Sequence, residues 1–176
     1  MNLLPVLLAA AAISLPAQEA ALGARVHGLL PMGDLRTLTG HQIGLGLAAF
    51  VDIPVGRGLV LRPAVGAQHI PKGDALGLGG TQTRVTSVDL MVEALWFPNE
   101  DADHGPYLIG AVGGQQWRLS STGISPATLS YTRIGISGGL GYQLSPRLGF
   151  EARGFWSPIT PAITATGLMA GATVRF

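Results

Sequence analysis

Residues 168–176 read LMAGATVRF, and their alternation decides the fold. Counting back from Phe176 by twos gives only apolar residues, whereas the residues between them are mostly polar or small. An alternation of period two predicts a β-strand, because successive side chains of a strand point to opposite faces. This segment is therefore expected to have one apolar face and one polar or crowded face.

The same pattern recurs along the chain and predicts eight strands. The expected strands are residues 23–30, 42–53, 59–70, 84–97, 107–119, 131–144, 148–156 and 168–176. The segments between them are rich in Gly, Pro, Ser and Asp, which favour turns. Beyond the first 17 residues no apolar stretch repeats at helical spacing, so we expect no helix there.

The first 17 residues, MNLLPVLLAAAAISLPA, predict a cleavable secretory signal peptide. They contain an apolar run followed by small residues. Cleavage is expected after Ala17 or as late as Ala20, so that one domain spans residues 18–176. A buried N-terminal helix is the alternative, because no Lys or Arg precedes the apolar run.

The composition restricts the class of protein. Of 176 residues, 47% are hydrophobic and 12% are charged, and the formal net charge is +1. This near-neutral balance gives no basic surface for nucleic acid, so we expect no nucleic-acid partner. Beyond the leader there is no run of roughly 20 apolar residues that could form a membrane helix. The absence of Cys fits an exported protein without disulfides.

The charged residues of the expected strands lie on the face opposite the aliphatic residues. They are Arg25, Arg62, Asp89, Glu93, Arg118, Arg133, Glu151, Arg153 and Arg175. Eight aliphatic faces can be hidden inside a soluble barrel or turned outward into lipid. Gly and Ala on the polar faces favour the second arrangement, because they suit a crowded, curved interior. We therefore predict a structural network of charges in the lumen, in which opposite charges pair.

These observations predict an all-β protein with a single closed, antiparallel, up-and-down transmembrane β-barrel of eight strands. Closure leaves no unpaired strand edge in the bilayer. The connections after the second and sixth strands are short, and those after the first, third and fifth are longer, whereas the nine-residue turn at residues 98–106 and the short loop at residues 157–161 break this trend. Outer-membrane barrels have short periplasmic turns and longer external loops, so we expect both ends of the barrel domain in the periplasm.

Two stretches, residues 107–114 (YLIGAVGG) and residues 136–153 (ISGGLGYQLSPRLGFEAR), together with the leader and Phe176, resemble small outer-membrane β-barrels of the OmpA type. The resemblance covers essentially the whole mature chain. It implies a monomer in the outer membrane of a Gram-negative-type bacterium, surrounded by outer-membrane lipid. It also implies recognition of the last strand by the barrel-assembly machinery, with Leu168, Val174 and Phe176 as the signal.

Aromatic residues are expected near the two membrane surfaces. The periplasmic belt would contain Trp96, Phe97, Tyr107, Tyr142 and Phe176, and Trp117 and Trp156 would lie toward the other side.

The expected function is a non-enzymatic one: a structural protein, or a surface-interaction or adhesion scaffold with an extracellular ligand at its loops. We expect no catalytic residue, cofactor or metal site. One alternative is a lipid-modifying enzyme of the lipid A deacylase or acyltransferase type, because His41 or His69 with Ser121 or Ser157 could complete a hydrolytic set. No His and Ser stand at a motif spacing, however. The second alternative is a soluble barrel that binds a small ligand.

Overall fold

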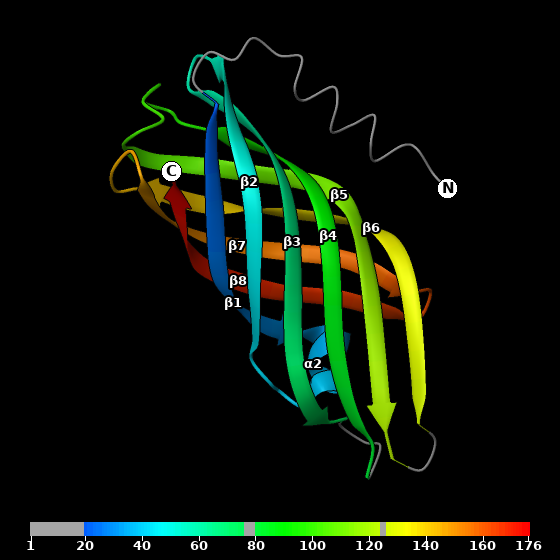
Figure 1. Ribbon diagram of the computed structural model, residues 1–176. Helices are drawn as coiled ribbons and strands as arrows, with labels where there is room; N and C mark the ends of the chain where they lie inside the picture. The colour runs from blue at the N-terminus through cyan, green and yellow to red at the C-terminus, as the bar shows by residue number, and fades with distance from the viewer. Residues whose placement is uncertain (1–19, 76–79, 124–125) are drawn as a thin grey trace.

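A computed structural model describes residues 20–75, 80–123 and 126–176, and the predicted signal peptide lies outside them. Eight antiparallel strands form a closed barrel in which each strand pairs with its sequence neighbours and β8 pairs with β1 (Figure 1). This confirms the predicted up-and-down barrel. The strands are β1 (Ala21–Met32), β2 (Gly44–Gly56), β3 (Leu59–Asp74), β4 (Gln82–Trp96), β5 (Gly105–Thr122), β6 (Ala127–Gln143), β7 (Leu148–Thr160) and β8 (Ile163–Arg175).

One helix, α2 (Gly33–Thr39), lies between β1 and β2, so the prediction of no helix after the leader is wrong. Its seven residues are too few to show helical periodicity. The local signals are Asp34 in the first turn and Gly40 at the C-cap, where a left-handed backbone with φ of 59° lets the Gly40 N–H bond to Arg36 O. In the described part of the chain, no helix has the length and hydrophobicity needed to cross a bilayer.

The barrel has two different ends, which we call the turn end and the helix end. The turn end holds the start of β1, the end of β8 and the connections after β2, β4 and β6. The β2–β3 connection has two residues, Arg57 and Gly58, both at positive φ, and the β7–β8 connection at the helix end is equally short. The helix end holds α2 and the connections after β3, β5 and β7. Figure 1 shows α2 and the C-terminus at opposite ends of the barrel.

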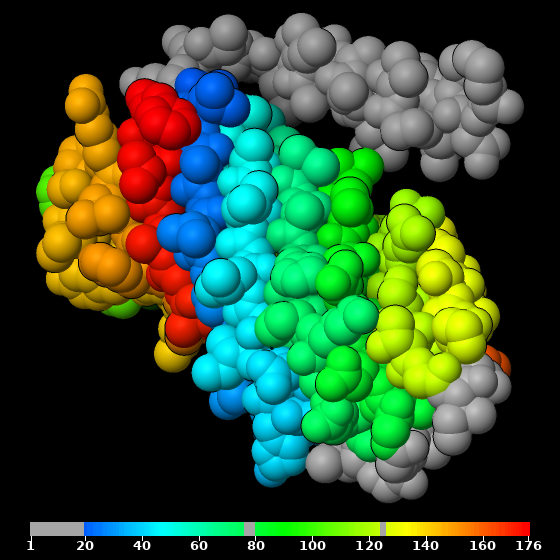
Figure 2. All heavy atoms as spheres, turned by 60° about the horizontal axis from the view of Figure 1, so that its bottom comes forward, coloured from blue at the N-terminus to red at the C-terminus, as the bar shows by residue number. Residues whose placement is uncertain are grey.

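An apolar band surrounds the barrel. In Figure 2, β8, β1, β2, β3 and β4 lie side by side in one continuous wall. About ten residues of each strand cross the band, which is the length a tilted strand needs to span a bilayer. None of the described side chains that face outward within the band is charged. Its large exposed members include Leu47, Val65, Val92, Val112, Leu140 and Leu168.

The facing of seven strands agrees with the sequence analysis, but that of β5 is reversed. Tyr107, Ile109 and Trp117 point into the barrel and are buried, whereas Leu108 and Val112 point outward and are exposed. Both faces of β5 are apolar over most of the strand, so hydrophobicity does not distinguish them. The aromatic residues face inward because this part of the lumen is itself apolar.

We expect Val92→Arg to lower the free energy of unfolding by about 2–4 kcal/mol, because Val92 faces outward near the middle of the apolar band. Urea unfolding of the barrel in lipid vesicles measures this loss. Val55→Arg is the matched control, since Val55 is equally exposed but lies at the β2–β3 turn. Equal urea midpoints for the two variants would contradict the assignment of the band.

Candidate functional site

A network of ion pairs fills the middle of the barrel. Glu93 accepts hydrogen bonds from Arg25 Nη1 at 2.9 Å and from Arg153 Nη2 at 2.8 Å. Glu151 accepts one from Arg62 Nη1 at 2.7 Å and also pairs with Arg25 and Arg153. All five side chains are buried. Because an isolated charge would be costly here, the sharing of two carboxylates among three guanidinium groups keeps the charged interior stable.

Asp52 and Arg175 extend this network toward the turn end. Asp52 accepts hydrogen bonds from Arg62 Nη2 at 3.0 Å and from Arg175 Nε at 2.7 Å. Arg175 Nη1 also donates to Ala102 O at 2.8 Å. The Arg62 guanidinium lies 4.0 Å from the centre of the Phe50 ring. Asp52 was not among the predicted lumen charges, although its place on the polar face of its strand was a signal.

Asp89 is buried in the same interior but forms no ion pair within the described residues. Gln68 Nε2 donates a hydrogen bond to Asp89 Oδ2 at 3.4 Å. The carboxylate lines a cavity of about 20 Å³, which His27, Gln68 and Gln115 also line and which has room for about one water molecule. The buried charged side chains are Arg25, Arg62, Arg153, Arg175, Asp52, Asp89, Glu93 and Glu151. The four positive charges therefore match the four negative charges.

Glycines make room for the large inward side chains. A side chain at Gly141 would overlap the Tyr107 ring, and one at Gly46 would overlap the His27 ring. Both glycines face inward on strands next to the residue that they accommodate. This close approach explains the abundance of Gly on the polar faces.

Arg118 and Arg133 do not join the network, so their prediction as lumen residues is wrong. Arg118 is exposed on the outer wall because β5 has the reverse facing. Arg133 has inward parity on β6 but is exposed at the helix end. Its Nε donates to Ile159 O at 3.2 Å, and its guanidinium lies 5.7 Å from the centre of the Tyr131 ring.

At the helix end, β6 and β7 are no longer paired with each other, and this gap in the barrel wall explains the exposure of Arg133. Strand β6 pairs with β7 only from Ile136 to Gln143, whereas residues 127–135 pair with β5 alone. Beyond that point, side-chain hydrogen bonds link Ser157 of β7 to Trp117 of β5 and to the backbone of β6. Trp117 Nε1 donates to Ser157 Oγ at 3.1 Å, and Ser157 Oγ donates to Ile134 O at 3.2 Å.

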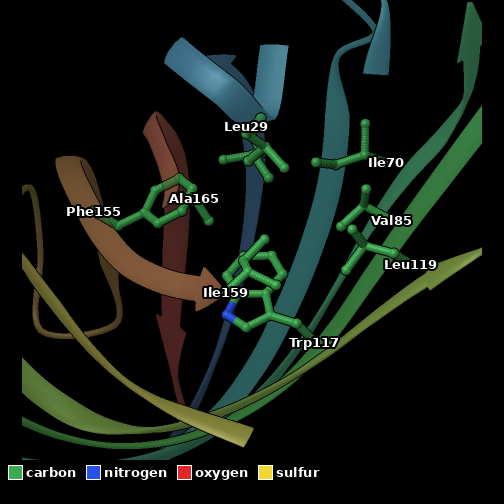
Figure 3. Close-up of a cluster of buried hydrophobic side chains, with 9 residues drawn as sticks. Leu29, Ile70, Val85, Trp117, Leu119, Phe155, Ile159 and Ala165 are labelled. Carbon is green, nitrogen blue, oxygen red and sulfur yellow. The ribbon is translucent and has the colours of Figure 1, made fainter. Parts of the chain in front are cut away.

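Two apolar clusters lie on either side of the charge network. The cluster at the turn end contains Val60, Leu95, Phe97, Tyr107 and Ile109. The cluster at the helix end contains Leu29, Leu35, Ile70, Val85, Trp117, Leu119, Phe155, Ile159 and Ala165, and most of it is labelled in Figure 3. Its Leu35 comes from α2, which covers the mouth of the barrel. The described lumen is thus a packed core of apolar, charged and apolar layers.

The aromatic residues divide between the outer wall and the lumen. Trp96, Tyr142, Trp156 and Phe176 are exposed on the outer wall. The predicted belt positions of Phe97, Tyr107 and Trp117 are wrong, because these residues belong to the two apolar clusters. The Tyr107 hydroxyl donates to Glu151 Oε1 at 3.0 Å and so links the turn-end cluster to the charges.

The residues considered for a hydrolytic set do not meet. The His41 ring bonds with Arg36, and His69 lies on the outer face of β3. Ser121 Oγ donates to a backbone carbonyl across the β5–β6 connection, and Ser157 bridges the divided wall. Across residues 20–75, 80–123 and 126–176, no hydrogen bond joins a His to a Ser, and no cluster of His, Asp and Glu could hold a metal ion.

Solved structures with the same architecture come from bacterial outer membranes. Ail, the attachment invasion locus protein of Yersinia pestis, matches with a TM-score of 0.62 and 11% identity over 89% of this chain and 97% of Ail. The N-terminal β-barrel domain of Pseudomonas aeruginosa OprF matches with a TM-score of 0.63 and 11% identity over 89% of this chain and 97% of that domain. This chain has the fold of the small outer-membrane β-barrels. Neisserial surface protein A matches with a TM-score of 0.56 and 16% identity over 90% of this chain and 100% of that protein.

No protein-family model matches the sequence, and no curated protein matches it either. The resemblance to OmpA-type barrels is confirmed in the fold of the chain. The fold and the uncharged apolar band together support a location in the bacterial outer membrane.

We expect Glu151→Gln to lower the free energy of unfolding by about 3–5 kcal/mol, because three arginines lose a shared buried charge. Urea unfolding in lipid vesicles measures the change, with heat-dependent gel migration as a check that the variant folds. Glu100→Gln at the exposed β4–β5 connection is the matched control and is expected to unfold like the parent. Equal midpoints for both variants would show that the network contributes little.

Proposed function

We propose that this chain is a non-enzymatic outer-membrane barrel with a structural or adhesive role, and that its helix end faces the outside of the cell. The packed lumen carries this proposal. The cavities inside the charge network measure only about 20 Å³ and about 10 Å³. Neither has room for a substrate or for a stream of hydrated ions, so we place any partner at the surface of the barrel, which at the turn end includes a hollow of about 680 Å³ lined in part by Asp52 and Arg175.

The orientation rests on the difference between the two ends. Outer-membrane barrels place short turns in the periplasm and longer connections outside. Here each end has one two-residue connection, β2–β3 at the turn end and β7–β8 at the helix end, but only the helix end has α2 and the parts of β3 to β6 that continue beyond the apolar band. These projecting elements are the surface that we propose for interaction.

The two alternatives have less support from the geometry. A soluble ligand-binding barrel needs an apolar cavity inside and a polar exterior, whereas this barrel has a packed lumen with a charged middle and an apolar exterior. A lipid-modifying enzyme needs a nucleophile and a base within hydrogen-bonding reach. In the described residues, the Ser and His candidates bond elsewhere.

Ail suggests a first probe for adhesion, because it was crystallised with the heparin analogue sucrose octasulfate. A non-adherent bacterium that displays this chain is expected to adhere to a surface coated with a sulfated polysaccharide, and soluble sucrose octasulfate is expected to compete. The lipid-modifying enzyme would be supported instead by two results together. The cells would adhere no better than cells without the chain, and mass spectrometry would show an altered acyl pattern of their lipid A.

The proposed orientation of the barrel can be measured on the same cells by labelling single cysteines. The chain has no Cys, so a single introduced Cys reports its own position. A membrane-impermeant maleimide should label Thr37→Cys in α2 on intact cells, and Arg147→Cys at the β6–β7 connection only after the outer membrane is permeabilised.

We also propose that the outward row of β8, with Leu168, Val174 and Phe176, is the signal read by the barrel-assembly machinery. Phe176→Ala is expected to reduce the amount of folded barrel in the outer membrane severalfold, measured by heat-dependent gel migration of membrane fractions. Leu144→Ala, an exposed apolar position at the same end but outside the last strand, should have little effect. Equal losses for both variants would argue against a specific signal.

A further inference from the structure

Three basic side chains stand together on the outer wall near the helix end. Gly73 on β3 pairs with Thr83 on β4, and both are buried, so the adjacent Lys72 and Arg84 lie on the exposed face. A register shift between Ile70 and Gly73 brings Lys72 beside Arg84. On β5, Arg118 pairs with Thr86 and is therefore a diagonal neighbour of Arg84. We call Lys72, Arg84 and Arg118 the basic cluster.

The basic cluster lies just beyond the apolar band. On β4, the outward series passes from Val88, the last apolar residue, to Thr86 and then to Arg84. On β5 it passes from Gly114 through Gln116 to Arg118. A bilayer has its polar headgroups immediately outside its hydrocarbon core, so the three cations stand at headgroup level.

The basic cluster has no ion-pair partner among the described side chains. Each of the buried arginines 25, 62, 153 and 175 has an ion-pair partner, whereas no described acidic side chain pairs with any member of the basic cluster. Asp74 lies on the same outward face of β3, two residues from Lys72, and its carboxylate accepts a hydrogen bond from Gln82 Nε2 at 3.1 Å. Like charges on neighbouring strands repel, so a bound anion would stabilise this arrangement.

A hollow of about 510 Å³ adjoins the basic cluster on the outer wall. Beside Arg118, its lining includes the hydroxyls of Thr86, Thr128 and Ser130 and the amide of Gln116. Hydroxyl and amide groups bind sugars through hydrogen bonds, and guanidinium groups bind phosphate through charge-assisted ones. The combination fits a sugar that carries phosphate.

We propose that the basic cluster and this hollow bind the phosphorylated sugar headgroup of an anionic glycolipid in the outer leaflet. A lipid is favoured over a soluble polyanion because the site is on the side wall next to the apolar band. A lipid whose acyl chains lie along Val88 and Leu90 can place its phosphate at Arg84 and Arg118. The inference rests on the proposed membrane location and orientation of the chain.

The test uses the full barrel in phosphatidylcholine nanodiscs that contain a small fraction of lipid A, a phosphorylated and acylated disaccharide. Native mass spectrometry counts the lipid A molecules that stay bound after release into detergent. The parent is expected to retain lipid A, and Lys72→Gln/Arg84→Gln/Arg118→Gln is expected to bind it about tenfold or more weakly. Arg36→Gln/Arg57→Gln/Arg147→Gln removes as many exposed charges elsewhere and is expected to behave like the parent.

Two further probes identify the chemistry. We call the triple variant Lys72→Gln/Arg84→Gln/Arg118→Gln the cluster variant. Dephosphorylated lipid A keeps its acyl chains but lacks phosphate. The parent should therefore retain dephosphorylated lipid A as weakly as the cluster variant retains lipid A. A soluble sulfated polysaccharide should bind the parent and the cluster variant equally well. If the polysaccharide binds the parent better than the cluster variant and lipid A binds both equally, the site is one for soluble polyanions and the proposal is wrong. Equal lipid A retention by parent and cluster variant would also overturn it.

Failure of this proposal can be separated from failure of the proposed function. A parent that does not enter nanodiscs, judged by heat-dependent gel migration, would contradict the membrane location itself. A parent that enters nanodiscs but retains lipid A independently of the basic cluster would contradict only the lipid site.

Discussion

The sharing of Glu93 and Glu151 among three buried arginines is the interaction on which the barrel depends. These five residues come from β1, β3, β4 and β7, so the network joins opposite sides of the wall. A shift of one residue in the register of any of these strands would turn its charge into lipid and leave its partners unpaired in the lumen. The network therefore fixes the facing of each strand that contributes to it, and the apolar band outside follows from the same facing.

The wall is complete where the bilayer requires it and divided where water replaces lipid. Inside the hydrocarbon region every backbone polar group needs a partner, because nothing else can satisfy it. Strands β6 and β7 accordingly pair from Ile136 to Gln143 and separate beyond the apolar band. Past that point, the hydroxyl of Ser157 and the guanidinium of Arg133 bond to backbone carbonyls of the facing strand. Outside the membrane, isolated side-chain contacts are enough to hold the edges of the barrel.

How far the sequence predicts the structure depends on whether the two faces of each strand differ in polarity. Seven strands combine an aliphatic face with a face that bears charge or glycine, and both their existence and their facing were predictable. Strand β5 has apolar residues on both faces, so its facing depends on the tertiary structure: Trp117 fills the lumen, and Arg118 is consequently outside. The helix α2 was not predicted because its seven residues make only about two turns, which are stable only where Leu35 enters the mouth of the barrel.

The net charge of the chain conceals how its charges are distributed. The eight buried charged residues cancel within the lumen, so their contribution to any outer surface is small. The exposed charges are divided between the two ends, and the described helix end carries Arg36, Lys72, Arg84, Arg118 and Arg133 against Asp34 and Asp74. A formal charge of +1 therefore coexists with a distinctly basic surface beside the membrane. For a barrel with a charged core, only the charges outside the core can attract or repel a partner, and the facing of each strand decides which charges those are.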